Sequence, residues 1–599
     1  MPEVPEGEIP EGGVTFRDLA LARKGQGPLA PAWWALRRQG RLARTELVRS
    51  ALVRLWAGAV REAGPPPGPV ALGGVGSLGR SELGPMSDLD LVVVYEGRSW
   101  SADHRKRFAQ ALWYEIWDAG FDLDQSFRSL AECRRVASSD LPAATGLLSL
   151  RHLAGDEGLA GRAASAVLGD WRAAARRRLT DLSSSVARRE SAFGHLAYRL
   201  EPDLKEARGG TRDTVTLDAV VASWLAERPR RELGFDEARE YLLDVRDAVH
   251  LAAHRGTSLL LMADQDSAAR ALDPYLTADQ LLTNLARAGR TVAYALDTTI
   301  RRATGNLPGS HTSPAVIVRG RRQGPRLAPL AQGLAEFNGE IVLGAGPAPE
   351  EDPVLPLRAA RVAAQTGLAF EPLTVLSLRR CPPLPDPWPL AARQELAAFL
   401  AEGLPIIATW EALDQAGLIV RLWPQWAPVR NLIQRNPLHR YTVDRHQVEA
   451  AARLAGLDLG TAPPDLVAVA TLFHDLGKRP GERDHAGLGA LLARPLAAHL
   501  GYAAEEVDFI VTLIRHHLTL AELATSCDPA ASATQEHLAS AVGHRLDLLD
   551  GLAALTEADA RATGPKAWTK LRASLIRQLV AATRARLAQV QGLAQGPPL

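Results

Sequence analysis

The sequence predicts an α+β protein that is mostly helical, with one small mixed α/β domain near the N-terminus and helical domains after it. Three strand-like runs support the α/β domain: PVALGGVG (69–76), the β-branched run LDLVVVY (89–95), and GFDLDQSFRSL (120–130), in which apolar and polar residues alternate. Helical spacing of apolar residues dominates from about residue 160 to 305 and again from about residue 389 almost to the end.

Length and composition exclude several classes of protein. The chain has 599 residues, which at roughly 150 residues per domain corresponds to about four structural units. Hydrophobic residues make up 46% and charged residues 23%, which excludes a disordered chain. The net charge of +1 provides no general attraction to nucleic acid or to an anionic membrane, so we expect neither as a partner.

The cysteines and the N-terminus indicate the compartment. Cys133, Cys381 and Cys527 are far apart and odd in number, which gives neither a disulfide framework nor a CxxC metal site. The first residues, MPEVPEGEIPEGG, lack the apolar segment of a signal peptide, and no run of 18 apolar residues occurs. We therefore expect a cytoplasmic protein that does not span a membrane.

Shifts in composition predict the order of domains. The prolines of AGPPPGP separate an initial helical stretch from the first strand, and Gly/Pro-rich segments interrupt shorter elements between residues 306 and 390. We expect a flexible tail over residues 1–28, an α/β domain over 29–150 and a helical domain over 151–305. We then expect a connecting region over 306–430, a second helical domain over 431–585 and a fraying tail over 586–599.

The most specific local pattern is GSLGRSELGPMSDLDL, residues 76–91. A strand that ends in Gly76-Ser77 lets the backbone approach a phosphate, to which the Ser hydroxyl can donate. Asp88 and Asp90 open the next strand, and side chains two residues apart in a strand share a face. Both carboxylates can therefore hold the same divalent ions, which we expect to be Mg²⁺, for attack on the α-phosphorus of a triphosphate.

A third carboxylate from a neighbouring strand would complete this site. FDLDQ offers Asp122 and Asp124 in alternation, and we favour Asp124 as a catalytic residue and metal ligand. A lone Asp-x-Asp is usually a strand edge with surface acids. The combination with Gly-Ser and an apolar strand, however, resembles the signature of DNA polymerase β-like nucleotidyltransferases.

A second group of polar residues lies on predicted helices of the C-terminal domain. His446 lies at helical spacing among apolar residues, His474-Asp475 follows an apolar helix, and Asp559 lies on another helix. This set resembles the ligands of HD-family metal-dependent phosphohydrolases. Imidazole and carboxylate groups suit Mn, Fe, Zn or Mg, so the metal stays open.

Further histidines bear on the number of metal ions. His485 and His517 are candidate ligands of a second ion, and His516 lies beside His517. A single buried histidine is more often a hydrogen-bonded core residue, so the number of ions, one or two, stays open. Lys478 follows the His-Asp pair and either binds phosphate or lies on the surface.

The order of the two sites resembles that of the bifunctional uridylyltransferase/uridylyl-removing enzymes of nitrogen regulatory protein PII. EPDLKEARGGTRD (201–213) resembles the Pro-x-Leu-Lys-Glu-x-x-Gly-Gly-x-Arg-Asp motif of this family. VRDAVHLAAHRGTSLLLMADQ resembles its following helices, and YTVDRH (441–446), LFHDLGK, RDHAGLG and RHHL resemble its HD segment. The similarity extends from about residue 45 to 585.

The resemblance implies two opposing activities. One site would transfer UMP or AMP from UTP or ATP to a tyrosine of PII, and the other would hydrolyse this bond. It assigns transfer to Gly76, Ser77, Asp88 and Asp90, and removal to His446, His474, Asp475 and Asp559. Arg80 of the loop, with Lys205, Arg212 and Asp213, would bind nucleotide in the transferase cleft. The alternative role for Lys205, Arg212 and Asp213 is an interdomain salt-bridge network.

The chain departs from the family pattern in two places. Only about 40 residues follow Asp559, so we expect the tandem C-terminal ACT domains of the family to be absent, which leaves glutamine control open. The loop reads GSLGRSEL rather than Gly-Gly-Tyr-Gly-Arg-Gly-Glu-Leu, which leaves the base open.

Two other interpretations remain. One is a tRNA CCA-adding-type nucleotidyltransferase with an HD tail, which the near-zero net charge disfavours. The other is a catalytically inactive, nucleotide-binding regulatory scaffold, which the intact ligand sets disfavour.

Overall fold

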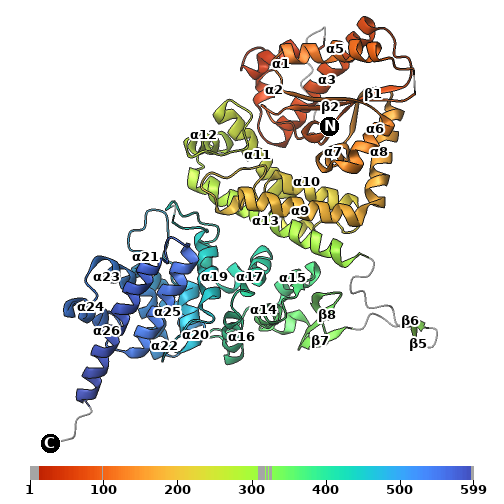
Figure 1. Ribbon diagram of the computed structural model, residues 1–599. Helices are drawn as coiled ribbons and strands as arrows, with labels where there is room; N and C mark the ends of the chain where they lie inside the picture. The colour runs from red at the N-terminus through yellow and green to blue at the C-terminus, as the bar shows by residue number, and fades with distance from the viewer. Residues whose placement is uncertain are drawn as a thin grey trace, which may run out of the picture. The chain divides into compact units, whose positions relative to one another are not determined.

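The computed structural model describes residues 13–97, 99–307, 317–318, 321–322, 327–436 and 438–594. The chain forms two compact units, Met1–Ser310 and His311–Leu599 (Figure 1). The predicted fold class, α+β and mostly helical, is confirmed. Among the described helices, none is long and apolar enough for a membrane span.

A four-stranded sheet of order β3-β2-β1-β4 lies at the centre of the α/β part of the first unit. β2 (Leu89–Tyr95) pairs antiparallel with β1 (Val70–Gly74) and parallel with β3 (Leu123–Ser129), and β4 (Arg151–Gly155) pairs antiparallel with β1. The sheet therefore continues past residue 150, where we expected the α/β domain to end. β1 is equally short but is buried along its whole length, whereas only Leu153 and Ala154 of β4 are buried, so β4 has no continuous apolar run that would identify it in the sequence.

Helices cover both faces of this sheet and bury the apolar run of β2. Leu91 and Val93 belong to a core formed with α1 (Phe16–Arg23), α3 (Arg37–Ala63) and α5 (Ala102–Asp118). Val92 and Val94 belong to a core on the other face, with α6 (Leu130–Ser139), α7 (Leu141–Leu147) and α8 (Glu157–Ala173). A strand that is buried on both faces requires such a continuous apolar run.

The N-terminal segment differs from the expected flexible tail over residues 1–28. α1 begins with a capping box, in which Asp18 N–H donates to the Thr15 hydroxyl and Thr15 N–H donates to the Asp18 carboxylate. Phe16 is fully buried and lies edge-on to Phe121 at 5.5 Å between ring centroids. The expectation of a tail is therefore wrong for residues 13–28, and residues 1–12 lie outside the described residues.

A helical part follows the sheet in the first unit. The remaining helices of this unit are α2 (Ala30–Trp34), α4 (Gly76–Gly79), α9 (Ala175–Phe193), α10 (Thr211–Ala222), α11 (Phe235–Ala253), α12 (Met262–Leu272) and α13 (Ala278–Gly305). α11 packs against α12, α13 and α3, so it connects the helical part to the helices beneath the sheet.

A buried group of ion pairs joins α3 to α11. The side chains of Arg44 and Asp247 are both fully buried, and Arg44 Nη2 lies 2.6 Å from Asp247 Oδ2. Arg44 also donates to the carbonyl oxygens of Trp33 (2.8 Å) and Leu83 (3.0 Å). Arg41 pairs with the same aspartate at 3.5 Å. These contacts fix the loop between α4 and β2 to two helices.

The first part of the second unit contains more structure than the connecting region that we expected over residues 306–430. β7 (Ala328–Ala331), β8 (Leu334–Phe337), β9 (Glu340–Leu343) and β10 (Ala369–Phe370) form a sheet, and β5 (Ile317–Val318) pairs with β6 (Arg321–Arg322). Asn338 and Gly339 both have positive φ, as in the two-residue turns that join hairpin strands. This Asn-Gly pair was a signal for the hairpin. Helices α14 to α18 follow at Leu355–Thr366, Pro372–Ser377, Leu390–Ala401, Ile406–Gln415 and Leu418–Leu422.

The rest of the second unit is all-helical. Its helices are α19 (Val443–Leu454), α20 (Pro464–Phe473), α21 (His485–His499), α22 (Ala504–Arg515), α23 (Thr519–Ser526), α24 (Ser532–Ala541), α25 (Leu546–Thr563) and α26 (Lys570–Ala594). The expected tail over residues 586–599 is wrong up to residue 594, because α26 continues and buries Leu587. Residues 595–599 lie outside the described residues.

Replacing Arg44 by methionine should lower the free energy of unfolding by about 3–5 kcal/mol, because the buried carboxylate of Asp247 loses a partner. Urea denaturation followed by circular dichroism measures this change. Arg49→Met on the same helix is the control, since its pair with Glu46 is exposed and should contribute less than about 1 kcal/mol. Equal shifts in the two variants would contradict the prediction.

Candidate active sites

The first candidate site is a cavity of about 820 Å³ in the first unit. It lies where β1 ends and where β2 and β3 begin. Carboxylates and cationic side chains both line it: Asp88, Asp90, Asp122 and Asp124, together with Arg80, Arg128, Lys205, Arg212 and Arg246. Such a mixture suits a ligand that carries both metal cations and phosphate groups.

The ladder between β2 and β3 brings the carboxylates together. Asp90 and Asp124 are partners in the parallel register, so their side chains share one face of adjacent strands. Asp88 comes directly before β2. Burial, together with the charges of Asp88 and Asp124, raises the pKa of Asp90 to about 6. A divalent cation would relieve this repulsion, so these residues fit the expected metal.

Gly76 and Ser77 lie beside these carboxylates. Gly76 has φ +59°, and a Cβ atom at this position would lie 2.0 Å from Oδ2 of Asp90, so only glycine fits. The hydroxyl of Ser77 is buried and has no hydrogen-bond partner within the described part of the chain. This donor is available to a phosphate oxygen, as a bound nucleotide requires.

Helix α11 supplies residues of this site that the sequence did not single out. Arg246 donates to the Glu82 carbonyl (2.8 Å), and Met86 N–H donates to Nδ1 of His250 (3.3 Å). Burial and the charge of Arg246 lower the pKa of His250 to about 4, so this ring is neutral. Arg239 pairs with the Glu82 side chain. Of these, Arg246 and His250 line the cavity, and their spacing of four residues, which puts them on one helix face, was the available signal.

Lys205, Arg212 and Asp213, the three candidate residues of the 201–213 motif, do not all lie at the same site in the structure. Lys205 and Arg212 line the cavity, whereas Asp213 does not. Asp213 is buried, lies 2.6 Å from Arg208 Nη1, and accepts from Gly209 N–H at 2.8 Å. Asp213, which we expected to bind nucleotide, therefore lies in a salt-bridge network, but its partners Arg189 and Arg208 belong to the same helical part, so these pairs are not the interdomain contacts of the alternative.

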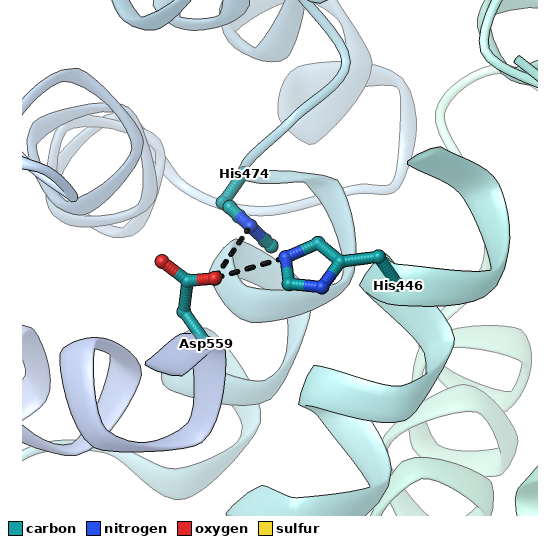
Figure 2. A group of neighbouring side chains, drawn as sticks. All are labelled: His446, His474 and Asp559. Atoms are coloured by element: carbon teal, nitrogen blue, oxygen red, sulfur yellow. Dashed lines mark ion pairs between the residues drawn. The ribbon is translucent and has the colours of Figure 1, made fainter. Parts of the chain in front are cut away.

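The second candidate site lies among the helices of the second unit. His446 of α19, His474 after α20 and Asp559 of α25 face one another (Figure 2). Oδ1 of Asp559 lies 2.9 Å from Nε2 of His446 and 3.9 Å from Nε2 of His474. One ligand atom from each of the three lies within 4.8 Å of the others. Nδ1 of His474 donates to the Thr471 carbonyl (2.8 Å), which leaves Nε2 as the ligand atom.

Asp475 connects this group to a second one. Its Oδ2 lies 3.5 Å from Nε2 of His474 and 3.8 Å from Nε2 of His446. Its Oδ1 lies 3.7 Å from Nε2 of His485 and 3.6 Å from Nε2 of His517. Asp475, His485 and His517 again offer atoms within 4.8 Å of one another. The arrangement thus offers two adjacent cation positions that share one carboxylate.

The chemistry of this donor set fits divalent metal ions. Nε2 of His474, Nε2 of His485 and Oδ1 of Asp475 are buried without a hydrogen-bond partner among the described residues. Burial and the charge of His474 lower the pKa of His517 to about 4, so its ring is neutral and can bind a cation. Although burial opposes it, the charges of Lys478 and the histidines hold the pKa of Asp475 well below its usual value. Buried, unpaired ligand atoms are costly unless a metal occupies them.

Other residues surround this centre. Lys478 Nζ lies 2.7 Å from Oδ2 of Asp475, so Lys478 faces the site and not the surface. His516 is not in either ligand group, and its Nδ1 lies 3.3 Å from the Thr519 hydroxyl. The sequence analysis did not single out His439, whose ring lies 5.6 Å from that of His446. His439 lies two residues before YTVDRH in the sequence, and this proximity was the signal that could have identified it.

An aromatic cluster supports the end of α20. The ring of Phe473, the residue before His474, lies 5.9 Å from Trp423 and 6.1 Å from Trp426. Trp410 stacks on Trp423 at 5.4 Å. Side chains from α17 to the segment after α18 therefore fix the backbone that carries His474 and Asp475.

Two families and several named proteins are similar to this chain. Residues 37–129 match the nucleotidyltransferase family DUF294, and residues 443–555 match the HD domain family. Three bacterial proteins named bifunctional uridylyltransferase/uridylyl-removing enzyme are similar over 88% of this chain. The proteins of Streptomyces coelicolor, Mycobacterium tuberculosis and Corynebacterium glutamicum are 46%, 41% and 33% identical. The chain spans 62%, 65% and 74% of their respective lengths.

Gly76→Ala should weaken binding of a nucleoside triphosphate with its divalent cation by roughly tenfold or more, because the added methyl displaces the Asp90 carboxylate. Equilibrium binding of a fluorescent nucleoside triphosphate analogue measures this effect. Gly146→Ala is the control, since Gly146 also lines the cavity but a Cβ there meets nothing within 4 Å. Similar affinity in both variants would show that Gly76 does not set the carboxylate position.

His517→Ala should remove one divalent ion per chain, because it deletes a ligand of the second cation position. Mass spectrometry of the metal content, after dialysis against limiting Mn²⁺, gives the count. His516→Ala should keep the wild-type count, since the neighbouring ring belongs to neither ligand group. An unchanged count in His517→Ala would contradict the role of His517 as a ligand that a second cation requires.

Proposed function

Because the chain belongs to the family of bifunctional uridylyltransferase/uridylyl-removing enzymes, we propose that it attaches a uridylyl group to a protein tyrosine and removes it again. The observation that carries this proposal is the pair of ligand clusters. One has several carboxylates, among them Asp88, Asp90 and Asp124, at a cavity that also contains cationic side chains, and the other has histidines and aspartates on five helical segments. Each cluster lies in the unit whose residues match the corresponding family.

Transfer would take place in the first unit. Asp88, Asp90 and Asp124 would hold two Mg²⁺ ions, which when bound neutralise the triphosphate and stabilise charge that develops at the α-phosphorus. Arg80, Lys205 and Arg212 bring positive charge to the phosphate oxygens. The tyrosine oxygen bonds to the α-phosphorus of UTP, the bond to the β-phosphate breaks, and pyrophosphate leaves. The phenolic proton passes to a carboxylate of the cluster.

Removal would take place in the second unit. His446, His474, Asp475 and Asp559 would hold one divalent ion, and Asp475, His485 and His517 a second, which when bound lower the pKa of water and polarise the phosphodiester. Water adds to the phosphorus, the bond to the tyrosine oxygen breaks, and free tyrosine and UMP result. Lys478 lies within 2.7 Å of Asp475 and orients this shared carboxylate.

The acceptor and the compartment follow from the family resemblance. We propose nitrogen regulatory protein PII as the protein that presents the tyrosine, since the motifs at 201–213 and 441–446 resemble those of enzymes that modify it. The three cysteines are unpaired, which suits the reducing cytoplasm. The curated relatives do not favour the tRNA CCA-adding interpretation.

The two sites should fail independently. Asp88→Asn with Asp90→Asn should lower transfer by roughly a thousandfold or more and leave removal intact, whereas His474→Ala with Asp475→Ala should do the reverse. Purified PII is incubated with UTP or ATP and Mg²⁺, and its intact mass is followed before and after the triphosphate is withdrawn. The mass of the adduct distinguishes UMP from AMP.

Three results would contradict this proposal. Loss of both activities in one folded double variant would contradict two separate sites. If PII is modified with ATP and not with UTP, the attached group is adenylyl and the proposed uridylyl transfer is wrong. No adduct from either triphosphate would favour the inactive scaffold.

A further inference from the structure

Strand β3 is one edge of the sheet in the first unit, and its outer side is open. In a parallel ladder, every second residue directs its N–H and C=O groups to the neighbouring strand. Leu89 N–H donates to the Asp122 carbonyl (2.9 Å), so the even-numbered residues of β3 pair with β2. Leu123, Gln125 and Phe127 therefore direct their backbone groups outward, and the described residues provide no hydrogen-bond partner for them.

The same strand borders the transferase cavity. Asp124, Ser126 and Arg128 share the strand face that carries Asp90 on β2, and all three line the cavity. Asp124 and Gln125, near the start of the strand, are exposed. The cavity thus extends along the open edge of β3. Asp124, near the start of this strand, is one of the carboxylates that we propose for transfer.

We propose that the segment of the acceptor protein that carries the target tyrosine binds as an additional strand along β3. This inference rests on the proposed transfer to a protein tyrosine. An added strand would lie about 4.8 Å from β3, and alternate side chains would face the cavity. A tyrosine on that face, level with Asp124, stands beside the carboxylate cluster. Backbone hydrogen bonds hold the segment, and the cavity selects its side chain.

Gln125→Pro tests the edge directly, because it removes an outward N–H and leaves every N–H that pairs with β2. Proline is compatible with an edge strand at such a position. The KM for PII should rise by roughly tenfold or more, since a backbone hydrogen bond and the fit of the segment are lost. The KM for UTP should stay unchanged. Gln125→Ala keeps the N–H and is the matched control, with wild-type KM values expected for both substrates.

The outcomes separate this inference from the proposed function. A wild-type KM for PII in Gln125→Pro, or an equal rise in Gln125→Ala, would overturn the added strand while transfer itself stands. If the wild-type protein modifies no protein at all, the proposed function fails first.

Hydrogen exchange gives a second test that needs no variant. In the wild-type protein, addition of PII should slow exchange at the amides of Gln125 and Phe127. Unchanged exchange at both amides under saturating PII would overturn the inference even if Gln125→Pro does not fold.

Discussion

The buried ion pair between Arg44 and Asp247 is the interaction on which the first site depends. Both side chains are fully buried, and Arg44 also binds the carbonyl of Leu83 in the loop that leads to Asp88. A well-packed apolar pair could give equal stability. An apolar pair could not donate a hydrogen bond to the Leu83 carbonyl, whereas Arg44 donates one from α3. The ion pair therefore holds the loop that leads to Asp88, one of the carboxylates that we propose as metal ligands, so it contributes to positioning as well as to stability.

The second site holds its ligands by another route. Its residues come from separate helices, and local backbone contacts orient them: His474 donates to the Thr471 carbonyl, and His517 Nδ1 lies 2.7 Å from the Ile514 carbonyl. The charge of Lys478 partly balances Asp475 before any cation binds. At the first site, by contrast, burial together with the charges of Asp88 and Asp124 raises the pKa of Asp90. Cationic side chains that include Arg80 and Lys205 line the same cavity, so positive charge reaches this site from several separate segments.

Local patterns predicted the parts of the structure that local geometry determines. The alternation in DLDL predicted that Asp88 and Asp90 share a face, and FDLDQ offered Asp122 or Asp124 from a neighbouring strand. In the structure, Asp124 is the register partner of Asp90. Asp213 pairs with Arg208 inside the motif and with Arg189 of α9, and the motif alone could not show the second of these contacts. α1 escaped prediction because eight residues give too little periodicity, and its place depends on contacts such as that of Phe16 with Phe121. The histidine and aspartate cluster became recognisable only through family resemblance, since its members are far apart in the sequence.

The two proposed reactions impose a further constraint when they are added together. Transfer followed by removal converts UTP and water into UMP and pyrophosphate and returns the acceptor unchanged, so simultaneous activity would only consume UTP. The two ligand clusters share no residue, and each lies in a unit with its own contacts. A ligand that binds one unit more tightly in one state can therefore shift one reaction without altering the chemistry of the other. In the proposed reactions the acceptor would add its own selection, because a free tyrosine would be a substrate only for the first cluster and a modified tyrosine only for the second.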